Sequence, residues 1–252
     1  MLRYPNGEFH KFRLRSLVGL IPLYAVEVLE SDELAAHPGF LRDVEWFIQN
    51  RPDLVGDACY TVGDGKKRYV LSIADPNQFK RLLERIWDPA EFLSPYGIRS
   101  LSKYHEQHPF QFEGRTMGYE PGEAAVQLKG GNSNWRGPVW FPTSYLLIHS
   151  FLRFGDAVGR QFSLPAPGQR EPITPHDMAL EAANRMIAIF KRGADGKRPC
   201  FGPYKKFQDD PHWKDYLLFN EYYHGDSGMG LGASHQTGWS GLVANLIDEW
   251  RR

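Results

Sequence analysis

The chain has 252 residues, with 30 basic and 30 acidic side chains and 14% aromatics. Such a length can bury a sizeable core, and the lack of a large block of one charge argues against nucleic acid or a membrane surface as a partner. Two isolated cysteines, Cys59 and Cys200, indicate a reducing compartment rather than a disulfide scaffold. The first residues lack a signal core and no apolar run could span a bilayer, so we expect a cytoplasmic protein.

Hydrophobic periodicity predicts helices along most of the first third of the chain. We expect one over residues 13–31, with Pro22 near its start or kinking it, and a second over 31–55 that Pro38 and Gly39 interrupt. Residues 63–75 predict a small β-hairpin because Asp64-Gly65 is a turn signal. Residues 75–89 form the clearest helix, which Asp75-Pro76 opens and Asp88-Pro89 closes.

The rest of the chain alternates long loops with helices. Residues 92–134 are rich in Gly, Pro and aromatics, and a loop of that length in a compact domain usually carries function. Helices are expected from Pro138 onward, over residues 176–192 and over 235–252, with another loop over 201–234. Six or seven helices with little strand between them favour an all-α fold.

The stretch GGNSNWRGPVWFPTSYLLIHS, residues 130–150, is the one around which the chain is organised. Its glycines supply backbone freedom, while amide, guanidinium and indole groups supply hydrogen bonds and flat apolar faces, which a polar, ring-shaped ligand such as a sugar requires. A tight turn with ordinary core packing is the alternative for the same residues. The candidate ligand contacts in this stretch are Asn132, Asn134, Trp135, Arg136 and Trp140.

Carboxylates that lie among aromatic residues are the best candidates for catalytic residues. The sequence lacks a phosphate-binding glycine loop, paired histidines at metal-ligand spacing and a nucleophile elbow. Glu221 lies in FNEYYHGDSG beside Tyr222, a setting that suits a general acid or base, although a carboxylate paired with an arginine is the alternative. Glu120 and Glu123 in YEPGE are further candidates. Paired carboxylates with aromatic platforms and amides describe a glycoside hydrolase.

Several motifs resemble glycoside hydrolase family 63 and its relatives, which include processing α-glucosidases and hydrolases of mannosylglycerate and glucosylglycerate. GGNSNWRGPVWFPTSYLL is similar to the signature of this family, and FNEYYHGDSGMGLGASHQTGWSGLVANLI is similar to its carboxy-terminal motif. RLRSLVGLIPLYAV and PYGIRSLSKYH resemble family segments that lie between. The likeness covers almost the whole chain in the right order.

The resemblance implies an (α/α)6 barrel, with residues 1–252 forming part of one catalytic domain and the loops at one end forming a sugar pocket. It also implies inverting hydrolysis of an α-glycosidic bond in a gluco- or manno-configured substrate. Glu221 matches the general base of the family. Trp135, Arg136 and Trp140 match its pocket-lining motif, and His235, Gln236 and Trp239 the pocket side of the last helix. No cofactor is implied, and no metal ligand is assigned.

The chain departs from the family pattern in length and in one catalytic group. A twelve-helix barrel needs more than roughly 400 residues, so we expect only the carboxy-terminal half here. The general acid of the family is an Asp that precedes the segment matched by the first residues, and Asp32 is better explained as a helix cap. We therefore expect a truncated product, a fragment or one piece of a split enzyme, whose acid lies upstream of Met1.

Three functions remain open from the sequence. The chain is a glycosidase completed by its missing half or by a self-association partner, a catalytically inactive sugar-binding or interaction domain, or a helical scaffold. The scaffold is disfavoured because amides, arginine and tryptophan concentrate together in loops. Arg15 also stays open: it contacts a polar ligand, pairs with a buried carboxylate, or is a solvated charge at a helix start. The exposed faces of a half-barrel would be apolar and would favour association.

Overall fold

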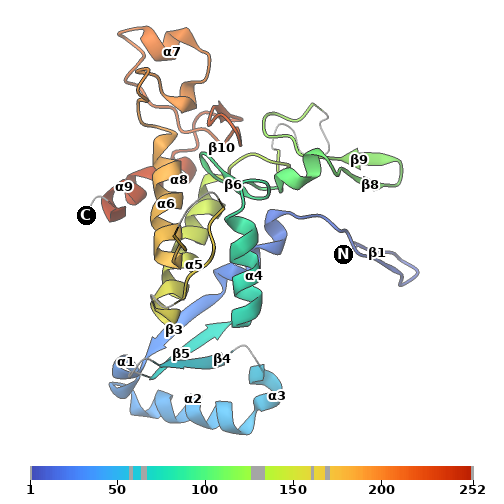
Figure 1. Ribbon diagram of the computed structural model, residues 1–252, viewed down its shortest axis with the longest axis vertical. Coiled ribbons are helices and arrows are strands. Elements are labelled where there is room, and N and C mark those ends of the chain that lie inside the picture. Colours follow the sequence, from blue (N-terminus) through green and yellow to red (C-terminus); the bar gives the residue numbers. More distant parts are fainter. Residues whose placement is uncertain are drawn as a thin grey trace.

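The computed structural model describes residues 2–56, 59–63, 67–125, 134–159, 162–167 and 171–250. Its centre is three helices, α4 (Pro76–Ile86), α5 (Phe141–Val158) and α6 (Pro175–Ala188), and α5 packs along α6 (Figure 1). The rings of Phe79 on α4 and Phe154 on α5 stack with centroids 3.7 Å apart. The following buried residues of these helices form the main core: Phe79, Leu83, Ile86, Leu147, Ile148, Phe151, Phe154, Met178, Ala182 and Met186.

Helix α4 confirms the strongest helix prediction from the sequence. Asp75 accepts hydrogen bonds from the backbone N–H groups of Asn77 and Gln78, and the Gln78 side chain accepts from the Asp75 N–H. This reciprocal capping box satisfies donors that the first turn of a helix leaves unpaired. Phe79, Leu83 and Ile86 then face the core at helical spacing, as the periodicity predicts.

A three-stranded antiparallel sheet lies at one end of the helices, in the order β3 (Val26–Glu30), β5 (Lys67–Ser72), β4 (Cys59–Gly63) (Figure 1). Pairing of β4 with β5 confirms the predicted hairpin, whose Asp64-Gly65 turn falls outside the described residues. The predicted helix over residues 13–31 is wrong. Short 3-10 helices at Leu17–Gly19 and Ile21–Tyr24 precede β3, in which Val26 and Val28 alternate with exposed Glu27 and are buried.

Three helices follow β3 and lie beside the sheet: α1 (Ser31–Ala35), α2 (Pro38–Asn50) and α3 (Pro52–Val55). Pro38 opens α2 instead of only breaking a longer helix, because proline suits the first helical turn. Helix α2 buries none of its side chains, and an apolar groove of about 820 Å³ separates it from the sheet. Phe40 and Phe47 of α2 line this groove opposite Leu71 and Ile73.

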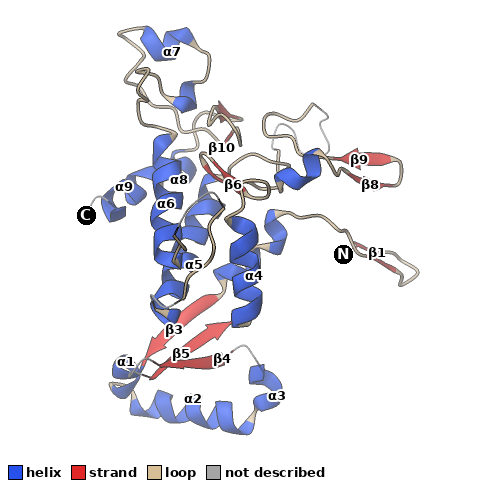
Figure 2. Ribbon diagram, viewed as in Figure 1, coloured by secondary structure: helices blue, strands red, loops and turns tan. Residues whose placement is uncertain are grey.

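The opposite end of the helices carries loops with short antiparallel pairs (Figure 2). These are β1 (Leu2–Arg3) with β2 (Phe9–His10), β6 (Leu93–Ser94) with β7 (Gly97–Ile98), β8 (Phe110–Phe112) with β9 (Arg115–Met117), and β10 (Tyr222–Tyr223) with β11 (Gly230–Leu231). Further 3-10 helices span Lys103–Glu106 and Pro199–Phe201, and the remaining helices are α7 (Lys205–Asp209), α8 (Thr237–Ser240) and α9 (Val243–Trp250).

The predicted all-α fold, the carboxy-terminal half of an (α/α)6 toroid with a small β-hairpin, is confirmed only in part. Helices dominate the described residues, but strands build five small sheets there, and the described helices do not close into a barrel (Figure 2). Some of the sheets arise where alternating side chains bury one face of a strand, as in β3. Others arise where the backbone N–H and C=O groups of two loop segments hydrogen-bond to each other. None of the helices within the described ranges combines the length and apolar character that crossing a bilayer requires.

Candidate active site

Three aromatic rings form a stack next to the start of α5, and a fourth packs against it nearly at a right angle. The indoles of Trp135 and Trp140 lie almost parallel with centroids 3.7 Å apart, and Trp140 stacks in turn on Tyr222 at 4.9 Å. Trp239 meets the edge of Trp140 at 6.3 Å. Trp140 is 2% and Tyr222 0% exposed, whereas Trp135 is 43% exposed. The stack therefore has a buried inner part and one ring, Trp135, at the surface.

The backbone of Val139 explains why α5 starts at Phe141 and not at Pro138, as the sequence predicts. The Val139 N–H donates to the carbonyl of Tyr223 and its carbonyl accepts from the Tyr223 N–H, at 2.8 and 2.9 Å. Val139 also forms an antiparallel bridge with Arg99. Because these pairings need an extended backbone, the helix begins only after Trp140, its N-cap residue. They also place Trp140 beside Tyr222.

Hydrogen bonds from Ala233 and Trp239 fix the position of Glu221. Its backbone N–H donates to the carbonyl of Ala233 at 2.8 Å, and its carbonyl accepts from the indole N–H of Trp239 at 2.9 Å. One carboxylate oxygen, Oε2, accepts from the Ala233 N–H at 3.4 Å. The side chain is half-buried, directly before the buried Tyr222 in the sequence. Burial, together with the negative charges of Glu123 and Glu221, raises the pKa of Tyr222 to about 12.

Asn134 ties the aromatic stack to the loop that carries Glu120 and Glu123. Its side-chain NH2 donates to the carbonyls of Glu120 and Gly122 at 2.8 and 2.7 Å, and its Oδ1 accepts from the Arg136 N–H. The Asn134 carbonyl accepts from the indole N–H of Trp140 at 2.9 Å. Asn134 is 2% exposed, so its amide fixes the shape of the loop.

Arg136 and Glu120 form an ion pair at 2.7 Å, with 18% and 35% of their side chains exposed. The guanidinium Nε of Arg136 is buried and makes no hydrogen bond within the described ranges. Glu123 is exposed on the same loop. A polar rim of two carboxylates and one guanidinium thus lies next to the aromatic stack.

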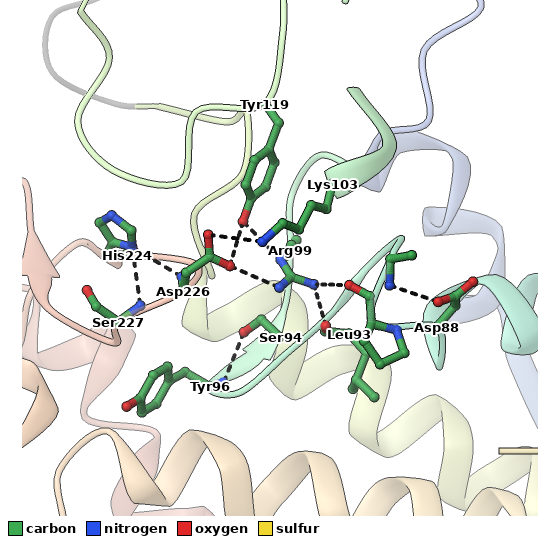
Figure 3. Close-up of polar contacts among 12 residues, drawn as sticks. Asp88, Leu93, Ser94, Tyr96, Arg99, Lys103, Tyr119, His224, Asp226 and Ser227 are labelled. Atoms are coloured by element: carbon green, nitrogen blue, oxygen red, sulfur yellow. Dashed lines mark hydrogen bonds and ion pairs between the residues drawn. The ribbon is translucent and has the colours of Figure 1, made fainter. Parts of the chain in front are cut away.

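A partly buried ion pair that the sequence alone does not reveal joins the same loops (Figure 3). Arg99 is 3% exposed and donates to Asp226 Oδ1 at 3.0 Å and to the Tyr119 hydroxyl at 2.9 Å. The Tyr119 hydroxyl itself donates to Asp226 Oδ1, and Lys103 Nζ lies 3.7 Å from Asp226 Oδ2. Burial would raise the pKa of Asp226, but these hydrogen bonds and positive charges outweigh it and hold the pKa below its usual value.

The structure thus brings nine predicted residues into one region: Glu120, Glu123, Asn134, Trp135, Arg136, Trp140, Glu221, Tyr222 and Trp239. His235 and Gln236 are exposed just before α8, where the Gln236 N–H donates to the Phe219 carbonyl. Asn132 lies outside the described residues. The substrate contacts proposed for all these side chains stay predictions.

Arg15 contacts a buried carboxylate, the second of the roles that the sequence leaves open. Its guanidinium pairs with Glu91, whose side chain is 5% exposed, and lies over the Tyr104 ring, 3.6 Å from the centroid. Arg85 and the Ser102 hydroxyl bind the same carboxylate. A buried carboxylate with several donors is a structural partner for Arg15.

The family comparison agrees with this geometry. Residues 68–240 match the family model described as a mannosylglycerate hydrolase MGH1-like glycoside hydrolase domain. The chain belongs to the MGH1-like glycoside hydrolases. This match and the second relative described below confirm the predicted resemblance to glycoside hydrolase family 63 and its relatives.

Two fungal proteins are similar to this MGH1-like chain. An uncharacterised protein of Saccharomyces cerevisiae is 44% identical over 252 aligned residues, which cover 95% of this chain and 23% of the yeast protein. A probable mannosyl-oligosaccharide glucosidase of Schizosaccharomyces pombe is 25% identical over 176 residues, which cover 70% of this chain and 16% of that protein. The chain thus spans less than a quarter of the length of these relatives.

In this MGH1-like chain, Gly137 packs so closely between loops that it leaves no room for a side chain. Its φ of +146° lies in a region that other residues rarely adopt, and a Cβ there would lie 2.7 Å from the Tyr119 ring and 2.9 Å from the Glu120 carbonyl. Gly225 packs as closely, because a Cβ on it would lie 2.6 Å from the Gly137 carbonyl.

We predict that Gly137→Ala lowers the free energy of unfolding by about 2–4 kcal/mol, because backbone strain and a steric clash add together. Urea unfolding measures this change. Gly238→Ala is the matched control: a Cβ there meets nothing within 4 Å and the position lies in α8, so we expect no loss of stability. Equal effects of the two substitutions would show that the packing around Gly137 tolerates a side chain.

Proposed function

We propose that this chain carries the general-base side of an inverting glycosidase site, acting on an α-glycosidic bond of a gluco- or manno-configured sugar. The observation that carries the proposal is the position of Glu221, which directly precedes the buried Tyr222 of the aromatic stack and is fixed by Ala233 and Trp239. In inverting hydrolysis a carboxylate takes a proton from the water that attacks the anomeric carbon. Glu221 has this role in the proposal, and Trp135 offers its exposed face to the sugar ring.

The relatives support the choice of sugar. The description of the family model names a mannosylglycerate hydrolase, and the fission yeast relative is a probable mannosyl-oligosaccharide glucosidase. Hydrolysis of a natural glycoside also needs a general acid for the leaving oxygen. We propose that this acid and the remaining helices of an (α/α)6 toroid come from a segment or partner chain that adjoins this region. The unburied apolar face of α2 is available for such an association.

A glycosyl fluoride separates the role of the base from that of the acid. Fluoride leaves without protonation, so a site that holds only the base can still catalyse attack by water. We expect the chain to release fluoride from an α-D-glucosyl or α-D-mannosyl fluoride and to form the β-anomer of the sugar, detected by proton NMR. Formation of the α-anomer would contradict inversion. Sugar binding without any hydrolysis would favour the inactive sugar-binding alternative.

We predict that Glu221→Gln lowers the turnover of the fluoride substrate about 10²- to 10⁴-fold and leaves sugar affinity nearly unchanged, because an amide of the same shape cannot accept the proton from water. Fluoride release and calorimetric titration measure the two quantities. Glu84→Gln is the matched control, since Glu84 is exposed on α4 and makes none of the contacts of the candidate site. Joint loss of binding and turnover in Glu221→Gln would assign this residue a structural role.

We predict that Trp135→Ala weakens sugar binding about 5- to 20-fold, because the variant loses the apolar face on which the ring packs. Trp46→Ala removes an indole of similar exposure on α2, at the other end of the molecule, and should leave affinity unchanged. Both variants are titrated with the same methyl glycoside. If Trp135→Ala binds like the wild type, its indole only packs against Trp140.

A further inference from the structure

His224 lies three residues after Glu221 and has one ring nitrogen committed to its own loop. Its Nδ1 accepts hydrogen bonds from the backbone N–H groups of Asp226 and Ser227, at 3.1 and 3.3 Å. A backbone N–H can only donate, so Nδ1 must be the unprotonated nitrogen of the ring. The neutral imidazole therefore carries its proton on Nε2.

The surroundings of the ring favour its neutral form. Burial lowers the pKa of His224, and the negative charge of Asp226 opposes this only in part. Asp226 itself is committed to Arg99, Tyr119 and Lys103 (Figure 3). His224 thus presents an uncharged N–H donor, which suits a neutral oxygen better than an anion.

The protonated nitrogen points away from the cluster that fixes the ring. In Figure 3 the second nitrogen of His224 lies on the far side of the ring from Asp226 and Ser227. A Cβ on Gly122 would lie 3.4 Å from this Nε2, so the ring lies against the loop that carries Glu120 and Glu123. In the part of the chain that the structure describes, Nε2 makes no hydrogen bond.

We propose that Nε2–H of His224 donates a hydrogen bond to one hydroxyl oxygen of the sugar ring that binds beside Glu221, and thereby helps to select that sugar. This inference rests on the proposed function of the site. Two observations carry it: the fixed tautomer, and the position of the donor next to the loop that carries Glu120 and Glu123. If His224 only stabilised the turn through residues 224–227, its Nδ1 acceptor would be enough for that role.

Two substitutions separate the two nitrogens. The Oδ1 of asparagine takes the place of Nδ1, so His224→Asn keeps the acceptor for the turn and loses the donor. The amide nitrogen of glutamine takes the place of Nε2, so His224→Gln keeps the donor and loses the acceptor. We therefore expect His224→Asn to unfold at the wild-type temperature and His224→Gln to be less stable.

The test is calorimetric or NMR titration with methyl α-D-glucopyranoside, methyl α-D-mannopyranoside and their 2-, 3-, 4- and 6-deoxy analogues. We predict that His224→Asn binds the preferred parent sugar about 5- to 10-fold more weakly than the wild type, the effect of one neutral hydrogen bond. For one deoxy analogue the two proteins should bind equally, because the partner hydroxyl is already absent. His224→Gln should keep the wild-type ranking of the analogues.

Two results would overturn this inference while the proposed function stands. One is equal affinity of His224→Asn and the wild type for every sugar. The other is a decrease in affinity by the same factor for every analogue, which indicates a distorted site. If the wild type binds none of these sugars, the proposed function fails and the inference fails with it.

Discussion

The extended backbone of Val139 is the constraint on which the candidate site depends. It pairs with Arg99 on one side and with Tyr223 on the other, so three distant segments meet at one residue. The pairing delays the start of α5 until Phe141 and places Trp140 against Tyr222. The partly buried Arg99–Asp226 ion pair joins two of the same segments a second time. An extended residue between a loop and a helix thus sets the geometry of the aromatic stack.

Buried residues and accessible residues form separate layers in this arrangement. Trp140, Tyr222 and Asn134 are buried and have their faces or amides occupied by other parts of the protein. The side chains that remain accessible are those of Trp135, Glu221 and the polar rim of Glu120, Glu123 and Arg136. A buried layer that fixes an outer layer is what pre-organised recognition of a sugar requires, because less side-chain freedom is lost on binding.

Most of the residues that the sequence selects lie in one region of the structure, whereas part of the predicted secondary structure is wrong. Trp135, Arg136 and Glu221 could be chosen because unusual residue types cluster in short motifs, and α4 because its caps and periodicity are local. The strand β3 was missed because Leu29, Val28 and their neighbours suit a helix or a strand, and pairing with β5 decides between them. Arg99 and Asp226 were missed as a pair because 127 residues separate them, and no local pattern reports that contact.

The most direct test of this account is a crystal structure of the chain with a bound iminosugar, a cationic analogue of the sugar in the hydrolytic transition state. The account predicts that the ring packs against Trp135 and that the Glu221 carboxylate lies within reach of the anomeric carbon through one ordered water. An iminosugar bound elsewhere, with the region around Trp135 and Glu221 empty, would contradict the assignment of this region as a glycosidase site.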